Sequence, residues 1–328
     1  MFRRSWLYAG RADQVHAPGD YVASELPGGE PALIVRGQDE QLRGFFNVCR
    51  HHAAAVVTDA EGSARQLRCP YHGWTYALDG ELKGTPDFTG VCDFDRSANG
   101  LVPLECAGCA IWAFVKVDAG GPSLEQFLGV DLVRQLDALG LARLRWLERR
   151  SYTLGCNWKV FVDNYLDGGY HVPHLHKGLD SVLEYSEYTI TNGDRYCLQS
   201  SPMVSDGAEE RTKAVRQGER AHYYWIYPNF MINCYGHTMD TNLVIPRDVD
   251  RTEVIFDFYF ADVSESARAA NMDSIAVSEQ IQQEDVAICE SVQRGLQSRA
   301  YGAGRLSVRR EAGEHLFHRL LARDLRQG

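Results

Sequence analysis

The amino-acid sequence predicts an α+β protein in which a first part built of short strands is followed by a second part of longer strands and helices. The first part alternates β-branched and aromatic runs with turn residues, and its expected strands span residues 32–35, 42–48, 66–68, 74–78 and 110–117. A helical pattern over 124–143 then marks the change from β to α. We therefore predict one domain over residues 1–118 and a second over residues 119–328.

The second part carries its own strands and one long helix. Strands are expected over residues 223–227, 242–245 and 251–260, and a helical pattern without proline runs from 264 to about 295. In the first part, Asp79-Gly80 is typical of a tight hairpin turn. Neither part contains an internal repeat, so the sequence favours two separate globular domains.

Composition and charge restrict the kinds of function. Hydrophobic residues make up 45% and charged residues 24% of the 328 residues, the balance of an ordinary globular protein. The net charge of −10 leaves no basic surplus for phosphates, so nucleic-acid binding is not expected. No apolar run approaches the roughly 20 residues of a membrane helix, and no apolar stretch follows Arg3-Arg4, so we expect neither a membrane span nor a secretory signal. In the cytoplasmic protein that this predicts, nine cysteines indicate metal or redox chemistry rather than a disulfide framework.

Two short motifs in the first part combine cysteine with histidine. They are Cys49-x-His51 and Cys69-x-x-His72. Two thiolates and two imidazoles are suited to a [2Fe–2S] cluster in which one iron takes both cysteines and the other both histidines. A structural zinc ion is the alternative, although zinc knuckles more often contain paired cysteines. We predict a [2Fe–2S] cluster held by these four residues.

A third motif, Cys106-x-x-Cys109, has the spacing of a thioredoxin-like redox pair. It stands directly before an apolar strand, and no helix opens after it. We interpret it as a packing feature rather than a redox centre.

The second part contains a dense group of histidines. His171, His174 and His176 lie within six residues, just after Asp163 and Asp167. Ferrous iron that activates oxygen commonly binds two histidines and one carboxylate and keeps other positions open. Pro173 is expected to break any helix here, so that the chain can wrap a metal. The sequence favours His171 and His176 as ligands and leaves His174 as an alternative to either.

The third ligand is expected on the long helix. Val277, Ile281, Ile288, Val292 and Leu296 form an apolar stripe in which Asp285 stands. An aspartate on a buried helix face is costly unless it has a partner. We predict that Asp285 completes the iron site; the alternative is a buried salt bridge.

Taken together, these motifs resemble the α subunits of Rieske oxygenases. The second half is similar to choline monooxygenase and related quaternary-ammonium oxygenases. The stretches that carry this likeness are Asp163-Asn164-Tyr165-Leu166-Asp167, Tyr170-His171-Val172-Pro173, Tyr227-Pro228-Asn229-Phe230, the run Met239 to Pro246, and Glu284-Asp285 with Cys289 to Leu296. The resemblance implies an N-terminal all-β Rieske domain and a C-terminal helix-grip (START-like) catalytic domain with an antiparallel sheet. It also implies a head-to-tail homotrimer, in which Asp167 links His72 of one subunit to His171 of the next. Asn164 joins Asp167 in the implied catalytic group.

The resemblance also implies a reaction. It is the O₂-dependent monooxygenation of a small substrate, here a choline- or betaine-like quaternary ammonium or N-methyl compound. Electrons are expected from NAD(P)H through a separate reductase or ferredoxin, because the chain lacks a Gly-x-Gly-x-x-Gly nucleotide fingerprint. A quaternary ammonium requires aromatic faces, and the expected substrate contacts are Tyr165, Tyr223, Trp225 and Tyr235. The alternatives are a Rieske oxygenase that acts on an aromatic or other uncharged substrate, and a Rieske electron carrier that is no enzyme.

Overall fold

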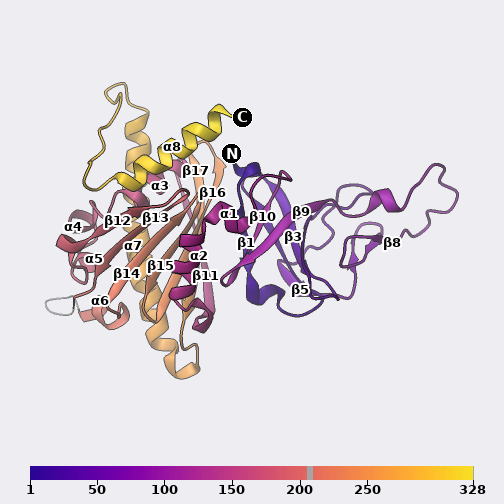
Figure 1. Ribbon diagram of the computed structural model, residues 1–328, viewed down its shortest axis with the longest axis horizontal. Helices are drawn as coiled ribbons and strands as arrows, with labels where there is room; N and C mark the ends of the chain where they lie inside the picture. Colours follow the sequence, from indigo (N-terminus) through magenta and orange to yellow (C-terminus); the bar gives the residue numbers. More distant parts are fainter. Residues whose placement is uncertain (205–209, 328) are drawn as a thin grey trace. The chain divides into compact units, whose positions relative to one another are not determined.

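The structure, a computed structural model, describes residues 1–204 and 210–327. The chain forms two compact units, Phe2–Phe127 and residues 128–328 with Met1, and each is described here by itself (Figure 1). The strands of the first unit are β1 (Leu7–Arg11), β2 (Asp20–Leu26), β3 (Glu30–Arg36), β4 (Leu42–Phe46), β5 (Glu61–Ser63), β6 (Leu67–Arg68), β7 (Thr75–Tyr76), β8 (Leu82–Gly84), β9 (Pro103–Cys109) and β10 (Trp112–Lys116).

Two sheets build the first unit. Seven strands pair in the order β1-β10-β9-β4-β3-β2-β5, and β6-β7-β8 form a smaller sheet of their own. The core lies along β3, where Leu33, Ile34 and Val35 are fully buried. Asp79-Gly80 joins β7 to β8, with a hydrogen bond from the Gly80 N–H to the Ala77 carbonyl, so the predicted hairpin is confirmed.

Asn47 fastens the loop that leaves β4. Its amide nitrogen donates to the Val57 carbonyl at 2.9 Å, and its side-chain oxygen accepts from the N–H groups of Val56 and Val57 at 2.9 and 3.1 Å. The side chain is 6% exposed. These bonds close a loop over residues 47–57, which contains Cys49 and His51.

The second unit surrounds one antiparallel sheet, with strands in the order β11-β17-β16-β15-β14-β13-β12. These are β11 (Arg145–Leu154), β12 (Thr189–Asn192), β13 (Tyr196–Pro202), β14 (Arg220–Ile226), β15 (Phe230–Tyr235), β16 (Thr238–Asp248) and β17 (Arg251–Phe260). The helices are α2 (Val130–Ala138), α3 (Trp158–Leu166), α4 (Val172–Leu175), α5 (Lys177–Asp180), α6 (Glu210–Val215), α7 (Arg268–Leu296) and α8 (Ala312–Arg326), and α1 (Leu124–Leu128) precedes them at the division between the units. The helical pattern over 124–143 is thus two helices, which are interrupted at Gly129.

Helices α3 and α7 position the functional residues. They pack against each other, and α3 also contacts β16 and β17, while α7 contacts β11 and α6 (Figure 1). Helix α8 is attached to α3 by the 2.9 Å contact between His318 Nε2 and Asp163 Oδ1. This arrangement of helices on an antiparallel sheet agrees with the fold class that the sequence predicts.

The buried face of α7 differs from the predicted apolar stripe. Ile288, Val292 and Leu296 are 38%, 43% and 46% exposed, so the second half of that stripe faces outward. Val277 of the predicted stripe is buried, as is Ile275, but most buried positions form a largely polar row spaced three or four residues apart. The row is Asn271, Ser274, Ser278, Gln282 and Cys289, with Asp285 between the last two. Polar residues can be buried here because the neighbouring elements offer them partners.

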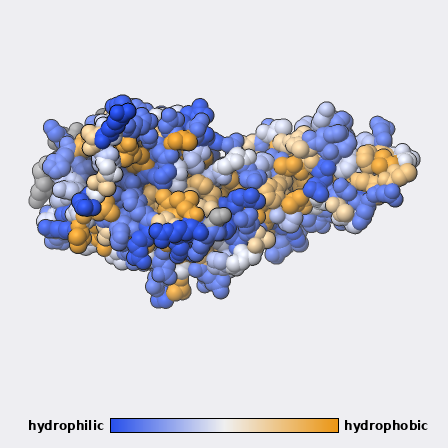
Figure 2. All heavy atoms as spheres, turned by 90° about the horizontal axis from the view of Figure 1, so that it is seen from above, coloured by the Kyte–Doolittle hydropathy of each residue, from blue (hydrophilic) through white to orange (hydrophobic). Residues whose placement is uncertain are grey.

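None of the helices in the described residues is long and apolar enough to cross a membrane. In the view of Figure 2 the visible surface is mostly hydrophilic, and hydrophobic residues occur there in separate small areas.

The three hydrogen bonds of Asn47 give the first prediction. Asn47→Ala leaves two N–H groups and one carbonyl without partners inside the loop, and we expect the unit to lose about 1–3 kcal/mol of stability. Loss of visible cluster absorbance during urea unfolding measures the change. Asn99→Ala is the matched control, because the Asn99 side chain makes one exposed bond to the Asp95 carbonyl. Equal shifts of the urea unfolding midpoint in the two variants would contradict the conclusion that Asn47 stabilises the loop over residues 47–57.

Candidate active site

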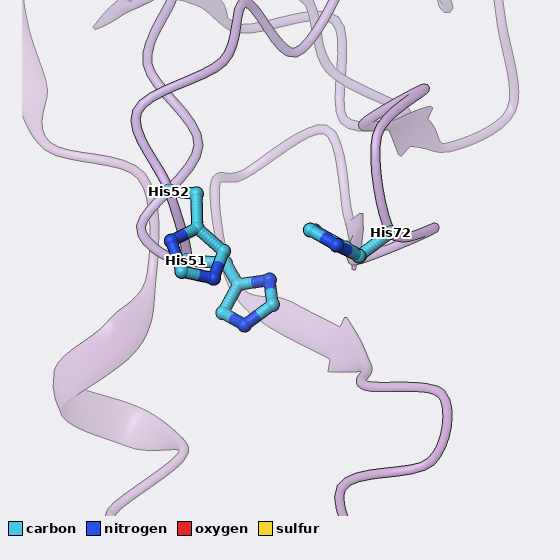
Figure 3. A group of neighbouring side chains, drawn as sticks. All are labelled: His51, His52 and His72. Atoms are coloured by element: carbon cyan, nitrogen blue, oxygen red, sulfur yellow. The ribbon is translucent and has the colours of Figure 1, made fainter.

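The two Cys-His motifs of the first unit meet at one end of its strands. Cys49 and Cys69 are 3% and 2% exposed, whereas His51 is half-buried and His72 is exposed. Figure 3 shows His51 and His72 on two separate loops, and their ring centroids lie 4.7 Å apart. His52 is exposed beside them. The structure therefore brings all four predicted ligands into one region.

The spacing of these four side chains favours a [2Fe–2S] cluster over a zinc ion. With metal–ligand distances of about 2.0–2.3 Å, the four ligand atoms of tetrahedral zinc lie within about 4 Å of one another. Around these two motifs, the described residues whose ligand atoms all lie within 4.8 Å of one another are His51, His52 and His72, and neither cysteine is among them. The thiols of Cys49 and Cys69 lie beside each other instead, and burial raises the pKa of Cys69. Cysteines on one side and histidines on the other fit a centre of two irons.

A buried atom without a partner supports the same conclusion. The Nδ1 atom of His51 makes no hydrogen bond to any described residue. The ring is fixed by stacking on Trp74 at 4.7 Å and an interplanar angle of 3°. Because a buried imidazole nitrogen is costly to leave unpaired, this atom is suited to ligate iron.

Cys106 and Cys109 lie in strand β9, opposite Val115 and Trp112 of β10. Burial raises the pKa of Cys106 to about 12, which keeps it a thiol rather than a reactive thiolate. Packing in a hairpin accounts for this motif, as the sequence suggested.

In the second unit, His171 is held by Asp167. Asp167 is the C-cap residue of α3, and its carboxylate accepts the backbone N–H of His171 at 3.0 Å and lies 2.5 Å from its Nδ1. Between them, Gly168 and Gly169 have φ of +70° and +67°, in the left-handed region. A Cβ on Gly168 would collide with the Arg310 carbonyl. Only this glycine pair lets the chain turn back so that Asp167 reaches the histidine.

His176 has an equivalent support from the long helix. Its Nδ1 lies 2.6 Å from Glu284 Oε2, and the ring is 2% exposed. The helix between the two histidines, α4, is a single turn, and Pro173 occupies its first turn. The expectation that Pro173 breaks any helix here is wrong, because proline needs no N–H partner at a helix start.

The Nε2 atoms of both histidines face Asp285. His176 Nε2 lies 3.1 Å and His171 Nε2 4.0 Å from Asp285 Oδ1, and the three ligand atoms lie within 4.8 Å of one another. Asn164 donates to the same oxygen at 2.8 Å. His174 is exposed and outside this group. Each histidine uses Nδ1 on a carboxylate and leaves Nε2 for a metal, which is how metal-binding histidines are usually oriented.

A cavity of about 100 Å³ opens beside these three residues. The two histidines and Asp285 line it, together with Asn164. Apolar residues form part of the wall: Phe161, Val172, Leu179, Leu183, Phe256 and Ile281. Tyrosines and polar side chains form most of the rest: Tyr165, Tyr188, Gln199, Arg216, Tyr223, Asn233, Tyr235, Asp240, Asn242, Ser278 and Gln282.

Three of the four predicted substrate contacts lie in this wall: Tyr165, Tyr223 and Tyr235. Trp225 does not line the cavity. It shares the strand face of Tyr223 but lies two residues further along β14, where its ring packs 5.5 Å from Phe317 of α8. The substrate contact predicted for Trp225 is therefore a packing contact with a helix.

Comparisons with known proteins agree with this geometry. Residues 5–95 match the Rieske [2Fe-2S] domain, and residues 141–327 match the ring hydroxylating alpha subunit (catalytic domain). The chain is 37% identical to choline monooxygenase of Arabidopsis thaliana, over 99% of this chain and 78% of that protein. It is 30% identical to the carnitine monooxygenase oxygenase subunit of Acinetobacter baumannii, over 93% of this chain and 83% of that protein.

A solved structure of a quaternary ammonium Rieske monooxygenase has the same fold. Its TM-score is 0.88 at 29% identity, over 98% of this chain and 89% of that one. The chain belongs to the Rieske oxygenase α subunits. The oxygenase thus has a Rieske [2Fe–2S] cluster and a mononuclear iron as cofactors, acts on a small molecule with O₂, and takes electrons from a separate donor.

Several residues of the site were not singled out from the sequence. They are Glu284, Tyr188, Arg216, Asp240 and Gln282. Glu284 precedes Asp285, and one helical turn separates Gln282 from it, so the helical period offered a signal for these two. Arg216 and Asp240 lie far from the iron motif in sequence, and only the tertiary fold brings them near it. Tyr188 lies nearer to the motif, but no spacing marked it as a site residue.

The second prediction tests the iron assignment. Asp285→Ala removes the carboxylate that both Nε2 atoms face, so we expect the loss of one iron per chain with an unchanged cluster spectrum. Iron analysis and visible absorbance measure both. Asp273→Ala, at an exposed position of the same helix, should keep all of its iron. An Asp285→Ala protein with full iron content would disprove the role.

Proposed function

We propose that this oxygenase is a monooxygenase that hydroxylates a small quaternary ammonium or N-methyl compound, with O₂ and with electrons from NAD(P)H that arrive through a separate reductase or ferredoxin. The observation that carries the proposal is the cavity beside His171, His176 and Asp285, whose wall combines tyrosine rings with a buried carboxylate. We also propose the cytoplasm as its location, where thiols such as those of Cys49 and Cys69 are kept reduced.

The cavity wall has the chemistry that a methylated cation requires. Its methyl groups donate no conventional hydrogen bond, so it is bound by aromatic faces and by negative charge. Tyr188 and Tyr223 are parallel to within 13°, with ring centroids 6.5 Å apart, and Tyr235 meets Tyr223 at 79° and 5.7 Å. Asp240 supplies the negative charge and is 5% exposed. A cation among these rings is adjacent to the proposed iron ligands.

We assign the iron to His171, His176 and Asp285. Ferrous iron in such a set supplies the activation of O₂ and keeps positions open beside the substrate. The chain itself fixes the ligands: Asp167 and Glu284 hold the imidazoles by Nδ1, and Asn164 orients Asp285 through its 2.8 Å hydrogen bond. Losing such supports typically costs about 10–100-fold in metal affinity or activity.

We assign the cluster to Cys49, Cys69, His51 and His72, where it stores the incoming electron. The exposure differs along this set, with both cysteines buried and His72 at the surface. A buried thiolate end and an exposed imidazole end favour electron transfer through the histidine side.

We further propose a head-to-tail homotrimer in which His72 of one subunit approaches Asp167 of the next. Asp167 has capacity for this contact, because Oδ2 binds His171 while Oδ1 accepts only the Tyr170 N–H, at 3.2 Å. A carboxylate oxygen can accept a second hydrogen bond, here from an imidazole N–H. The published description of the solved relative concerns inter-subunit electron transfer.

An electron carrier and an oxygenase for uncharged substrates each leave part of the second unit without a role. An electron carrier needs only the first unit and leaves the group at His171, His176 and Asp285 without a role. An uncharged aromatic substrate leaves Asp240 and Arg216, both buried in the cavity wall, without a charged partner in the ligand. Buried charges of this kind favour a charged ligand.

A third prediction concerns the substrate class. We expect choline, glycine betaine or carnitine to stimulate NADH consumption and to yield a hydroxylated or demethylated product in the presence of a reductase. Aromatic acids and neutral lipophiles should not do so, because they offer no cation to the tyrosine wall. Product formation from the second group alone would overturn the proposed substrate class.

A fourth prediction concerns the bridge. Asp167→Asn keeps an oxygen for His171 but loses the charge and one acceptor atom, so we expect both metal sites to remain and turnover to fall about 100-fold. Asp194→Asn, at an exposed position, is the control. Normal turnover in Asp167→Asn would show that the bridge lies elsewhere.

Mixed oligomers test the path between subunits. Asp285→Ala chains without the iron and Cys69→Ala chains without the cluster should each be inactive alone. Co-expressed, they should regain turnover if the cluster of one chain serves the iron of another. Mixed oligomers that stay inactive would indicate transfer within one chain.

A further inference from the structure

Arg216 is a buried cation in the wall of the substrate cavity. It follows α6, is 4% exposed and lines the cavity together with Ser278 and Gln282 of α7. Its Nη1 donates to Ser274 Oγ at 2.7 Å and its Nη2 to Ser278 Oγ at 2.5 Å, while its guanidinium lies 4.6 Å from the Tyr235 ring centroid. These contacts fix the position of the guanidinium, but none of the three partner side chains carries a negative charge.

No acidic side chain of the described residues forms an ion pair with Arg216. Its Nε atom is buried and has no hydrogen-bond partner there. A buried guanidinium is costly without a counter-ion, and an unpaired buried N–H adds to that cost. The pair is completed most simply by an anion that enters the cavity.

Gln282 offers a second unpartnered donor in the same wall. It is 2% exposed, and its Nε2 makes no hydrogen bond to any described residue. Ser274, Ser278 and Gln282 are spaced four residues apart, so they lie in one row on the buried face of α7. At a rise of about 1.5 Å per residue, Gln282 lies about 4.5 Å and Ser278 about 10 Å before Asp285 along the helix axis. A small ligand could therefore contact Gln282 at one end and lie beside the proposed iron ligand Asp285 at the other.

The cavity wall contains a basic and an acidic side chain, Arg216 and Asp240, which do not form an ion pair with each other. Burial raises the pKa of Asp240, and Arg216 lowers it through space, but the two form no ion pair. Asp240 Oδ2 accepts instead from Asn233 at 2.6 Å and Asn242 at 3.2 Å. A ligand with a positive and a negative end matches such a wall better than a simple cation.

We propose that Arg216 and Gln282 form a carboxylate-binding subsite, and that the substrate is a zwitterion whose trimethylammonium end lies among the tyrosines and whose carboxylate lies on Arg216. This inference rests on the proposed quaternary-ammonium function and specifies which quaternary ammonium compounds are substrates, namely those that carry a carboxylate. Choline has a hydroxyl where a betaine has a carboxylate, so it leaves the guanidinium unpaired. The relatives described above include enzymes named for choline and for carnitine, and the subsite favours the carboxylate-bearing class for this chain.

The test compares two ligands that differ in one charge. Isothermal titration calorimetry of the metal-loaded, full-length protein without O₂ uses γ-butyrobetaine and its primary amide. A charge-assisted pair with Arg216 is expected to make the carboxylate bind about 10–100-fold more tightly than the amide. Arg216→Gln should reduce the ratio of the two dissociation constants to near one, which a purely structural role of Arg216 would not do.

If Arg216→Gln does not fold, a second pair of variants tests the same preference for the carboxylate. Gln282→Glu places a carboxylate opposite that of the ligand and should reverse or abolish the preference for γ-butyrobetaine. Gln283→Glu makes the same change at the next, exposed position and should leave the ratio unchanged.

The outcomes separate this inference from the function on which it rests. Equal binding of γ-butyrobetaine and its amide to the native protein would overturn the subsite and leave the quaternary-ammonium function in place. A preference that survives both Arg216→Gln and Gln282→Glu would also overturn it, because the carboxylate would then bind elsewhere. If neither ligand bound and no quaternary ammonium supported turnover, the proposed function itself would fail.

Discussion

Two imidazoles and three carboxylates share a small volume in the second unit, and their arrangement constrains the elements around them. The Nε2 atoms of His171 and His176 face Asp285, while Asp167 and Glu284 hold the opposite nitrogens at 2.5 and 2.6 Å. Carboxylates this close repel one another unless a cation lies between them. A ferrous ion held by His171, His176 and Asp285 would offset that repulsion, and these residues come from the ends of α3 and α4 and the middle of α7.

Helix α7 connects the iron site with substrate recognition. Its buried face is a polar row in which Ser274 and Ser278 hold Arg216, Gln282 faces the cavity and Asp285 faces the histidines. A substrate bound along this row is placed relative to the iron by one rigid element. Supporting a site from a helix in this way gives better positional accuracy than a loop would.

The cluster motifs and the histidine motif could be predicted because their chemistry is local. Each motif places its thiol and imidazole within a few residues, and the structure brings His51 close to His72 and His171 close to His176. Asp285 was predicted as a ligand from an apolar stripe whose second half is exposed at Ile288 and Val292. Asp285 lies beside His171 and His176 because an acid inside a helical period shares a face with whatever the helix buries, whether that face is apolar or polar.

By itself, the sequence determined the order of the two domains and the family, and it predicted which residues would bind metal, since these depend on short motifs of neighbouring residues. The tertiary structure decided which side of α7 is buried, that Trp225 packs under α8, and that Arg216 and Asp240 share one cavity. Residues so far apart in sequence meet only through strand register and helix rotation. Both are set by the packing of the whole unit, and a shift of one residue in a strand turns every side chain to the other face.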